Sequence, residues 1–313
     1  MQKNNIKGIA VLLPAALIWG LAFVAQSDAA DHIGPFAFNA LRSFIATAML
    51  FSLLLFRKLK GGHPIMPKDS HARKIVALGG IACGIFLAIS VNLQQAGLTV
   101  YPEGVAGASR GGFITAIYVI IVPILSIVFG KKIPWAVWPA VAVALCGTYL
   151  LCLYNGFGGI YLGDFLMLGC AFSFSFQIMF IDRYGVEIGG VRLSMVQFGV
   201  CAVISLVLSL VFEPSGFDMA GIRNALFPIL YLGIMSSGVA YTLQILGQRF
   251  AEPAVASLTM SLESVFAAIG GWMFDEILLP HEIIGCALVF ASIIIVQIPD
   301  IISMIKSKGE NHV

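Results

Sequence analysis

The sequence predicts an all-α integral membrane protein with ten transmembrane helices arranged as two inverted five-helix repeats. The first observation is composition: 59% of the 313 residues are apolar, 11% are charged, and the mean hydropathy is +0.96. An ordinary soluble domain is about 45–50% apolar and about 25% charged. The second observation is that apolar runs recur along the whole chain. Since one span takes about 20 apolar residues, the chain has room for about ten spans and little else.

The first five spans are separated by charged or Pro/Gly-rich breaks. The first apolar run is longer than the roughly 7–15 residues of a secretory signal peptide, so we interpret it as a span that is not cleaved. Spans are expected at 8–26, 35–56, 75–98, 105–129 and 135–154.

The second five spans follow from the same reading of apolar runs and breaks. They are expected at 162–181, 192–212, 225–248, 254–274 and 282–299.

Positive charges alternate between the loops as ten crossings require. Of the 18 Lys and Arg residues, 15 fall in the N-terminus, the C-terminal tail and the loops near 57–74, 130–134, 182–192 and 249–253, whereas the opposite loops hold only Arg223. By the positive-inside rule, both termini are expected to be cytoplasmic, in a cytoplasmic (inner) membrane. A missing or additional helix would destroy this alternation, so the bias also supports the number of spans.

A faint internal repeat relates the two halves of the chain. A shift of 155 residues places Arg42 on Gln197, and a shift of 145 residues places the small residues Ala140 and Gly147 on Gly285 and Ser292. We therefore expect a first repeat over 1–155, a second over 160–300, and a cytoplasmic tail over 301–313. Because five spans is an odd number, the second copy must enter the membrane inverted, which is typical of secondary transporters with a midplane site.

Four segments carry a resemblance to a known family. They are Ile18-Trp19-Gly20 with Phe23, Leu41-Arg42-Ser43-Phe44, residues 112–118 (GFITAIY) followed by Val122-Pro123, and residues 261–268 (SLESVFAA). In this order they resemble the drug/metabolite transporter superfamily and, within it, the ten-helix EamA-type carriers. The resemblance implies a secondary active transporter that exports a small organic metabolite or drug-like solute.

The sequence departs from the family pattern in two places. Ser264 stands where the family usually has Pro, so the residue that would favour a kink in the ninth span is missing. The loop before the fourth span is also longer than usual, which affects the outer entrance.

Three charged residues are the candidates for a role at depth inside a predicted span, where a charge costs about 2.5–3.5 kcal/mol on insertion scales and usually faces a cavity or a partner. Glu263 lies near the middle of its span; it either ties helices together, as a protonated or Arg-paired group, or binds protons or a substrate ammonium group. Arg42 lies roughly 10 Å deep and either clamps helix ends or an acidic neighbour, or meets an anionic substrate group. Arg110 either snorkels outward with little effect or acts as a second outer cation.

Neutral polar and aromatic residues near mid-span complete the expected site. Tyr241 and Gln244 share a helix face, as do Asn92 and Gln95. The remaining candidate substrate or coupling residues are Trp19, Tyr118, Gln95, Gln177, Gln197 and Gln244. Such surfaces suit an amphipathic organic solute rather than a bare ion, but each residue alone is equally compatible with a contact between helices.

The sequence also argues against other functions. It has no HExxH or P-loop motif, so we expect neither an enzyme nor a metal or other cofactor. The net charge of +2 argues against a nucleic-acid partner. The expected partners are a small-molecule substrate and the lipid bilayer, with protons as the candidate coupling ion and either a monomer or a homodimer as the assembly.

Several alternatives stay open at this stage. The first is an importer or exchanger of phosphorylated or nucleotide-linked solutes, which only Arg42 and Arg110 could neutralise. The others are a membrane-embedded enzyme, a lipid scramblase, and a structural or receptor-like bundle.

Overall fold

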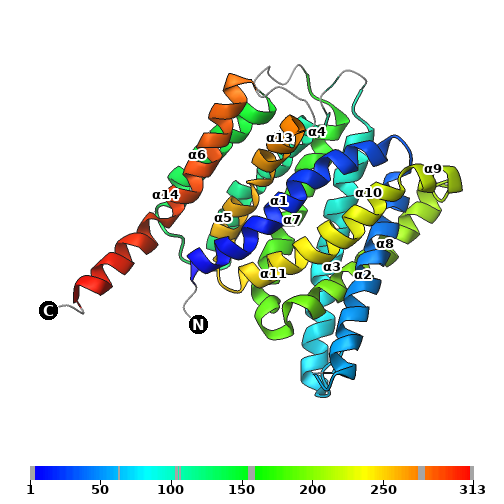
Figure 1. Cartoon of the computed structure of the whole chain (residues 1–313), viewed down its shortest axis with the longest axis horizontal. Helices are drawn as coiled ribbons and strands as arrows, with labels where there is room; N and C mark the ends of the chain where they lie inside the picture. The colour runs from blue at the N-terminus through cyan, green and yellow to red at the C-terminus, as the bar shows by residue number, and fades with distance from the viewer. Residues whose placement is uncertain are drawn as a thin grey trace.

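The computed structural model describes residues 4–62, 64–102, 105, 107–153, 159–273 and 279–310. Every regular element within these residues is helical (Figure 1). The helices are α1 (Asn5–Ala30), α2 (Pro35–Leu59), α3 (Ser70–Thr99), α4 (Gly107–Ala116), α5 (Tyr118–Val128), α6 (Val137–Cys152), α7 (Leu162–Ile188), α8 (Gly190–Phe212), α9 (Met219–Asn224), α10 (Leu226–Tyr231), η1 (Leu232–Ala240), α11 (Tyr241–Gln248), α12 (Pro253–Met260), α13 (Glu263–Met273) and α14 (Pro280–Glu310).

The helices occupy the ten predicted positions. Nine stretches of the described helices are long and apolar enough to cross a membrane, and α6 is a shorter apolar helix. Three predicted spans are each formed by more than one helix: the fourth by α4 and α5, the eighth by α10, η1 and α11, and the ninth by α12 and α13. The tenth span is α14, and α9 is a short helix outside the predicted spans. The prediction of an all-helical, ten-span membrane fold is confirmed.

Several helices extend beyond the predicted spans. The α3 helix begins at Ser70 because the Asp69 side chain accepts a hydrogen bond of 2.7 Å from the backbone N–H of Ala72. The α7 helix continues to Ile188 and ends where Gly189 adopts a φ of 87°, a conformation that glycine adopts without a steric cost. The α14 helix runs on through residues 301–310 of the predicted tail.

Helices from the two halves of the chain pack against each other. The most extensive contacts join α3 to α7, α6 to α14, and α2 to α8. The α6 and α14 helices form one edge of the bundle and α2, α3 and α8 form the other, with α1, α7 and the interrupted helices between them (Figure 1). The middle of the bundle is therefore surrounded by segments that are far apart in the sequence.

Three spans are interrupted near their middles. The fourth breaks at Ile117, the ninth breaks at Ser261 and Leu262, and the eighth contains the π-helix η1. The lack of a proline at position 264 therefore does not keep the ninth span continuous. The Ser261 hydroxyl donates to the Leu258 carbonyl oxygen (2.7 Å) and the Ser264 hydroxyl donates to that of Ser261 (2.9 Å), and such bonds compete with the regular helical ladder.

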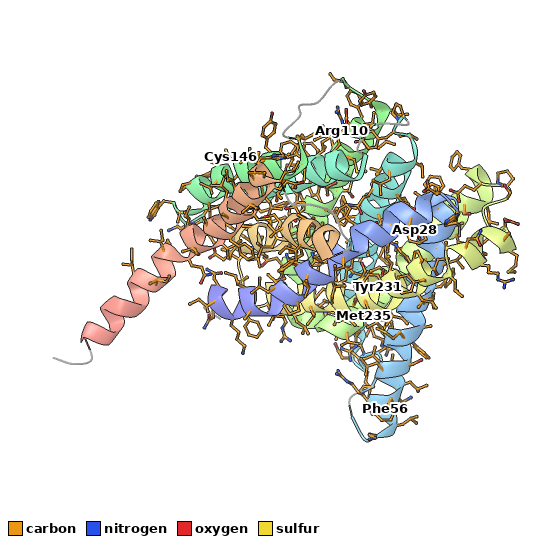
Figure 2. The ribbon with its side chains drawn as sticks, turned by 45° about the horizontal axis from the view of Figure 1, so that its top comes forward. Asp28, Phe56, Arg110, Cys146, Tyr231 and Met235 are labelled. Carbon is orange, nitrogen blue, oxygen red and sulfur yellow. The ribbon has the colours of Figure 1, made fainter. Side chains whose placement is uncertain are left out.

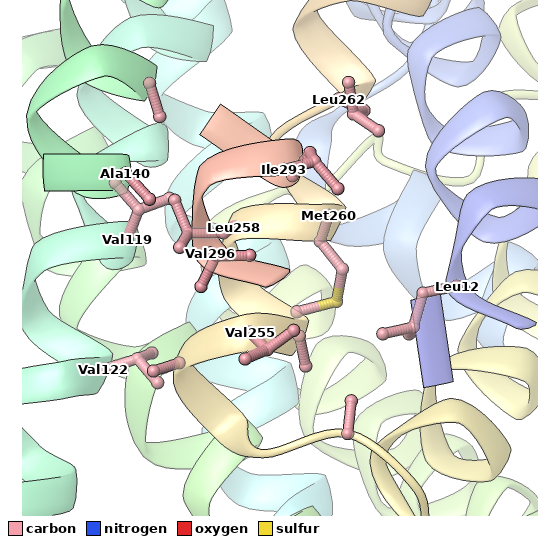
Figure 3. Packing of buried hydrophobic residues seen from close by; sticks show 14 of the residues in the cluster. Leu12, Val119, Val122, Ala140, Val255, Leu258, Met260, Leu262, Ile293 and Val296 are labelled. Carbon is pink, nitrogen blue, oxygen red and sulfur yellow. The ribbon is translucent and has the colours of Figure 1, made fainter. Parts of the chain in front are cut away.

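Apolar packing buries the α12 helix in the interior. Every residue of α12 is buried, whereas most of residues 263–269 in α13 are only partly buried. Leu12 from α1, Val122 from α5, and Val255 and Leu258 from α12 belong to one buried cluster there (Figure 3).

Small residues bring α6 and α14 into backbone contact. A Cβ atom added to Gly147 would lie 2.7 Å from the Gly285 carbonyl oxygen, and one added to Gly285 would lie 2.7 Å from that of Gly147. Close approach through small residues is a common way for membrane helices to pack.

Candidate functional site

A cavity lies in the middle of the bundle, where the three interrupted spans meet. Its volume is about 50 Å³, which is smaller than the roughly 300–1,000 Å³ of typical small-molecule sites. Its walls come from α1, α2, α3, α4, α5, α7, η1, α11, α12 and α13. The lining residues are Trp19, Phe23, Gln26, Arg42, Gln94, Thr115, Tyr118, Phe174, Ile178, Ser236, Tyr241, Gln244, Met260 and Glu263.

The cavity brings together some of the residues predicted from the sequence and leaves others outside. The predicted residues that line it are Trp19, Arg42, Tyr118, Gln244 and Glu263. Those that do not line it are Gln95, Arg110, Gln177 and Gln197.

Glu263 is the first residue of α13 and faces the cavity directly after the helix break. The Tyr118 hydroxyl donates a hydrogen bond to its Oε1 atom over 3.5 Å, which is long for an O–H···O bond. Among the described residues, no basic side chain lies within ion-pair distance of this carboxylate. The Arg-paired arrangement expected as one alternative is therefore not found there.

The backbone near Glu263 is held closely by α1. A Cβ atom added to Gly20 would lie 2.6 Å from the Glu263 carbonyl oxygen and 2.6 Å from the Phe266 Cβ atom. Glycine at position 20 thus allows α1 to pack directly against the start of α13, which fixes one wall of the cavity.

Arg42 reaches the cavity from α2 and is only 3% exposed. Its guanidinium carbon lies 5.6 Å from the centre of the Phe38 ring. Within the described part of the chain, its Nε atom has no hydrogen-bond partner and no carboxylate lies within ion-pair distance of it. The expected clamp onto helix-end carbonyls or an acidic neighbour is therefore not seen, because the side chain faces the cavity instead.

Arg110 is buried and forms an ion pair with Asp164, an arrangement that neither alternative included. It lies at one end of the molecule (Figure 2), where its Nε atom donates to Asp164 Oδ1 (2.5 Å) and an Nη atom donates to Asp164 Oδ2 (2.6 Å) and to the Gly159 carbonyl. The guanidinium carbon also lies 4.9 Å from the centre of the Tyr161 ring. Arg110 therefore joins the fourth span to the sixth, and its charge is balanced by Asp164.

The surroundings of Asp164 explain why this pair forms. Asp164 lies in the first turn of α7, where its carboxylate accepts a 2.9 Å hydrogen bond from the backbone N–H of Tyr161. The Tyr101 hydroxyl donates to the same carboxylate over 3.0 Å. Burial, followed by this hydrogen bond, raises the pKa of the Tyr101 hydroxyl above its ordinary value, so the hydroxyl keeps its proton and stays a donor.

Sequence analysis did not pair Arg110 with Asp164, although a signal was present. Asp164 begins a span on the same predicted side of the membrane where Arg110 begins another. An acid and a base at the same depth in two spans indicate an ion pair whenever those spans are neighbours.

The four predicted glutamines all form hydrogen bonds between helices. Gln244 Nε2 donates to Gln177 Oε1 and Gln177 Nε2 donates to Gln197 Oε1, both over 3.3 Å. This chain links α11, α7 and α8, and of its members only Gln244 lines the cavity. Gln95 donates from Nε2 to the Gln26 carbonyl oxygen over 3.1 Å and so joins α3 to α1.

Aromatic rings form much of the cavity wall. The Trp19 and Tyr241 rings meet edge to face with centroids 4.9 Å apart, and Tyr241 meets Phe198 in the same way at 5.2 Å. Tyr241 was noted from the sequence on the face of Gln244, but Phe23 and Phe174 were not expected as lining residues, because phenylalanine has no polar atom to set it apart in an apolar span.

The site combines a carboxylate, a guanidinium, amides, hydroxyls and aromatic rings. No group of three or more His, Cys, Asp or Glu residues in the described part of the chain could hold a metal ion. The arrangement can bind an organic molecule through charge, hydrogen bonds and contact with aromatic rings.

Comparisons with known proteins place the chain among membrane transporters. It matches the EamA-like transporter family twice, at residues 6–153 and 161–298. It is 30% identical over 285 residues to an uncharacterized transporter of Archaeoglobus fulgidus, a match that covers 90% of this chain and 83% of that protein. A crystal structure of a protein with 19% sequence identity has a TM-score of 0.73 and is matched over 94% of this chain and 98% of its own, a likeness that concerns the fold alone.

Proposed function

Since the chain belongs to the EamA-like transporter family, we propose that it is a secondary active transporter that exports a small organic metabolite or drug-like solute by alternating access. Membership of a transporter family implies a multi-pass membrane protein with a small-molecule substrate, and not an enzyme. The solute binds in the central cavity and leaves when the cavity opens to the other side.

The observation that carries this proposal is the pair of unbalanced charges in one cavity. Glu263 and Arg42 both line it, and no ion-pair partner for either lies within the described residues. A charge within a membrane protein is costly unless a partner or water compensates it. A bound solute supplies such a partner, whereas a purely structural bundle gains nothing from leaving the two charges open.

The position of the cavity supports transport as well. It lies where the interrupted fourth, eighth and ninth spans meet, and interrupted helices near the midplane are typical of binding sites in secondary transporters. In this mechanism, the repeats proposed over 1–155 and 160–300 exchange their conformations, which opens the cavity to one side of the membrane and then to the other. The tail over 301–313 and both termini are proposed to be cytoplasmic, in a cytoplasmic membrane, which the distribution of Lys and Arg supports.

Coupling to protons is proposed to occur at Glu263. Its carboxylate faces the cavity with a single long hydrogen bond from Tyr118 and no cation paired with it among the described residues. Such a group can take up a proton on one side of the membrane and release it on the other. Trp19 and Gln244 line the path, while Gln95, Gln177, Gln197 and Arg110 position the helices that form it.

The test compares the metabolites in the medium and in cells that express the wild-type protein, Glu263→Gln or Glu187→Gln at matched levels in the membrane. Glu187 is a suitable control because it is half exposed and pairs with Arg183 at the surface. We expect one or more compounds to accumulate in the medium with the wild type and with Glu187→Gln, but not with Glu263→Gln.

A second measurement separates coupling from solute binding. In proteoliposomes loaded with an exported compound, Glu263→Gln should lose accumulation driven by a proton gradient and can retain exchange of the compound. Proton-driven accumulation that survives unchanged in Glu263→Gln contradicts the coupling role. A medium that does not change with the wild type contradicts export.

A further inference from the structure

We infer that the protein binds an anionic phospholipid of the bilayer, with one acyl chain in a groove between α2 and α8 and the phosphate at Lys58 and Arg192. The site lies on the outer surface of the bundle, away from the central cavity, and goes beyond the proposed transport function. The inference is carried by the shape of the groove, by its depth in the membrane and by the basic side chains at one end of it.

An apolar groove of about 740 Å³ runs along the contact between α2 and α8. Phe44 and Phe51 of α2 line it and are 44% and 45% exposed, so the groove opens on the surface of the bundle. Gly199 of α8 leaves space in its wall, because a Cβ atom added there would have one neighbour within 4 Å, Thr47 Cγ2 at 3.7 Å. Thr47 has the one polar side chain among the described lining residues, and its hydroxyl donates to the Ser43 carbonyl oxygen (2.8 Å). The groove therefore offers apolar surface and no polar group that needs a partner.

The groove lies at the depth of the lipid tails. Phe44 and Phe51 belong to the apolar run over 35–56 and are seven residues apart, which is roughly 10 Å along a helix. The hydrocarbon core of a bilayer is about 30 Å thick, so a groove of this length within one span faces acyl chains. An acyl chain suits such a surface because it is apolar, narrow and flexible.

The course of the two helices decides which chain segments meet at each end of the groove. The Ser43 hydroxyl donates to Cys201 Sγ over 3.4 Å. Earlier in α2, the backbone N–H of Ala37 donates to Glu213, which follows the last residue of α8. The two helices thus run in opposite directions, and the end of α2 lies beside the start of α8.

Basic side chains gather at this end of the groove. Residues 57–74 include six Lys or Arg residues and one acidic residue. Lys58 is exposed and lies seven residues after Phe51. Arg192 lies three residues before Met195, which also lines the groove. Residues three or seven apart share a face of a helix, so both basic residues lie on the faces that form the groove. Clusters of Lys and Arg directly beside the hydrocarbon region attract anionic lipid headgroups.

The described protein does not balance the charges of Lys58 and Arg192. No carboxylate in the described part of the chain lies within ion-pair distance of either residue. Three N–H groups of the Arg192 guanidinium donate to carbonyl oxygens, those of Ile65 (2.7 Å), Pro64 (3.0 Å) and Ile188 (3.2 Å). These bonds hold the guanidinium in place without neutralising it, and they leave two of its five N–H donors for an anion. A lipid phosphate supplies the negative charge and the acceptor oxygens.

A second copy of the chain is the other candidate for the groove, and the charges disfavour it. A two-fold axis along the membrane normal would bring both copies of residues 57–74 to the same side of the membrane. With six basic residues and one acidic residue in each copy, these segments would repel each other. An anionic lipid at the same place lowers the positive charge instead.

The test measures lipid binding to the purified protein in detergent micelles by native mass spectrometry. The probes are dioleoylphosphatidylglycerol, which carries one negative charge, and dioleoylphosphatidylcholine, which has the same chains and no net charge. We expect the protein to bind phosphatidylglycerol at least about fivefold more tightly, because each Lys or Arg beside a headgroup contributes about that much. Glycerol 3-phosphate, which has a charged phosphate and no acyl chain, should not displace the bound lipid at equal concentration.

Variants separate the basic residues from the groove. Lys58→Gln should lower the affinity for phosphatidylglycerol about fivefold, and it breaks no ion pair among the described residues. Arg192→Gln should lower this affinity by at least as much. Gly199→Leu fills the groove from a position with space for a Cβ atom and keeps every charge, so it should weaken binding as well. Arg183→Gln removes a surface arginine that is 71% exposed and does not line the groove, and it should leave the affinity unchanged.

The outcomes decide between a lipid and the other occupants. Equal affinity for the two lipids, or an affinity for phosphatidylglycerol that neither Lys58→Gln nor Gly199→Leu lowers, overturns the inference. Displacement by glycerol 3-phosphate overturns it too, because the site then binds a phosphate without the chain. A dimer that separates in Gly199→Leu overturns it by assigning the groove to a second copy. Each of these results leaves the proposed transport function intact, because export is tested at Glu263.

Discussion

The buried pair of Arg110 and Asp164 gives the sharpest prediction about how the bundle is held together. Asp164→Asn keeps the size and shape of the side chain but removes its charge. The Arg110 side chain, which is 5% exposed, then loses the charged carboxylate to which it donates two hydrogen bonds. We expect this single substitution to destabilise the folded protein strongly.

The magnitude follows from the geometry of the pair. The two side chains are 5% and 13% exposed, and two hydrogen bonds of 2.5 Å and 2.6 Å join them. Removing one partner of a buried pair costs about 3–5 kcal/mol. Asn at position 164 can still accept one hydrogen bond and the Gly159 carbonyl still accepts another, so we expect about 3 kcal/mol, the lower end of that range.

A double substitution tests whether the cost comes from removing only one partner of the ion pair. Arg110→Met with Asp164→Leu replaces both charges by apolar groups of similar length. Because apolar groups are often as stable as a buried ion pair, the double variant should be more stable than Asp164→Asn by about 2 kcal/mol.

The assay is reversible unfolding of the purified protein in mixed detergent micelles, followed by circular dichroism. Arg183→Gln is the matched control, because Arg183 and Glu187 are 71% and 50% exposed and lie 3.6 Å apart. This exposed pair should contribute less than about 0.5 kcal/mol. If Asp164→Asn costs no more than Arg183→Gln, the pair does not hold the fourth and sixth spans together and the reasoning is refuted.

Two further predictions concern other contacts between spans. Gly147→Val places side-chain atoms against the Gly285 carbonyl oxygen, where even a Cβ atom would lie at 2.7 Å. It should lower the free energy of unfolding by about 1–3 kcal/mol in the same assay. An unchanged stability would show that α6 and α14 can separate freely. Glu213 accepts hydrogen bonds from the backbone N–H groups of Phe36 (2.9 Å) and Ala37 (2.8 Å) in the first turn of α2. Glu213→Gln should therefore lower the free energy of unfolding by about 1 kcal/mol and speed amide hydrogen exchange at these two residues. Unchanged exchange rates would contradict a capping role.

The number and place of the spans could be read from the sequence because each span must be apolar over about 20 residues. The helix ends moved, as at Ser70 and Ile188, where a side-chain cap and a glycine extend or end a helix outside the apolar run. The interruptions of the fourth, eighth and ninth spans were not predicted. The limits of the two repeats and the cytoplasmic position of the termini stay predictions.

The charged residues of the site could be found in the same way, but their partners could not. Glu263 and Arg42 stand out because a charge inside a span is costly, and both line the cavity. The same argument pointed equally to Arg110, which pairs with Asp164 instead. Which charge is balanced by protein depends on which spans are neighbours, and the sequence does not state this.

The neutral residues mark the limit of sequence analysis most clearly. Gln94 lines the cavity, whereas Gln95 donates to the Gln26 carbonyl oxygen of α1. The two glutamines are chemically identical and lie at the same depth, so hydropathy and spacing cannot choose between them. The sequence determined a ten-span membrane protein with a carboxylate and a guanidinium at depth. Only the tertiary structure decided which polar side chains face the cavity, because neighbouring residues point about 100° apart on a helix and packing against other helices sets its rotation.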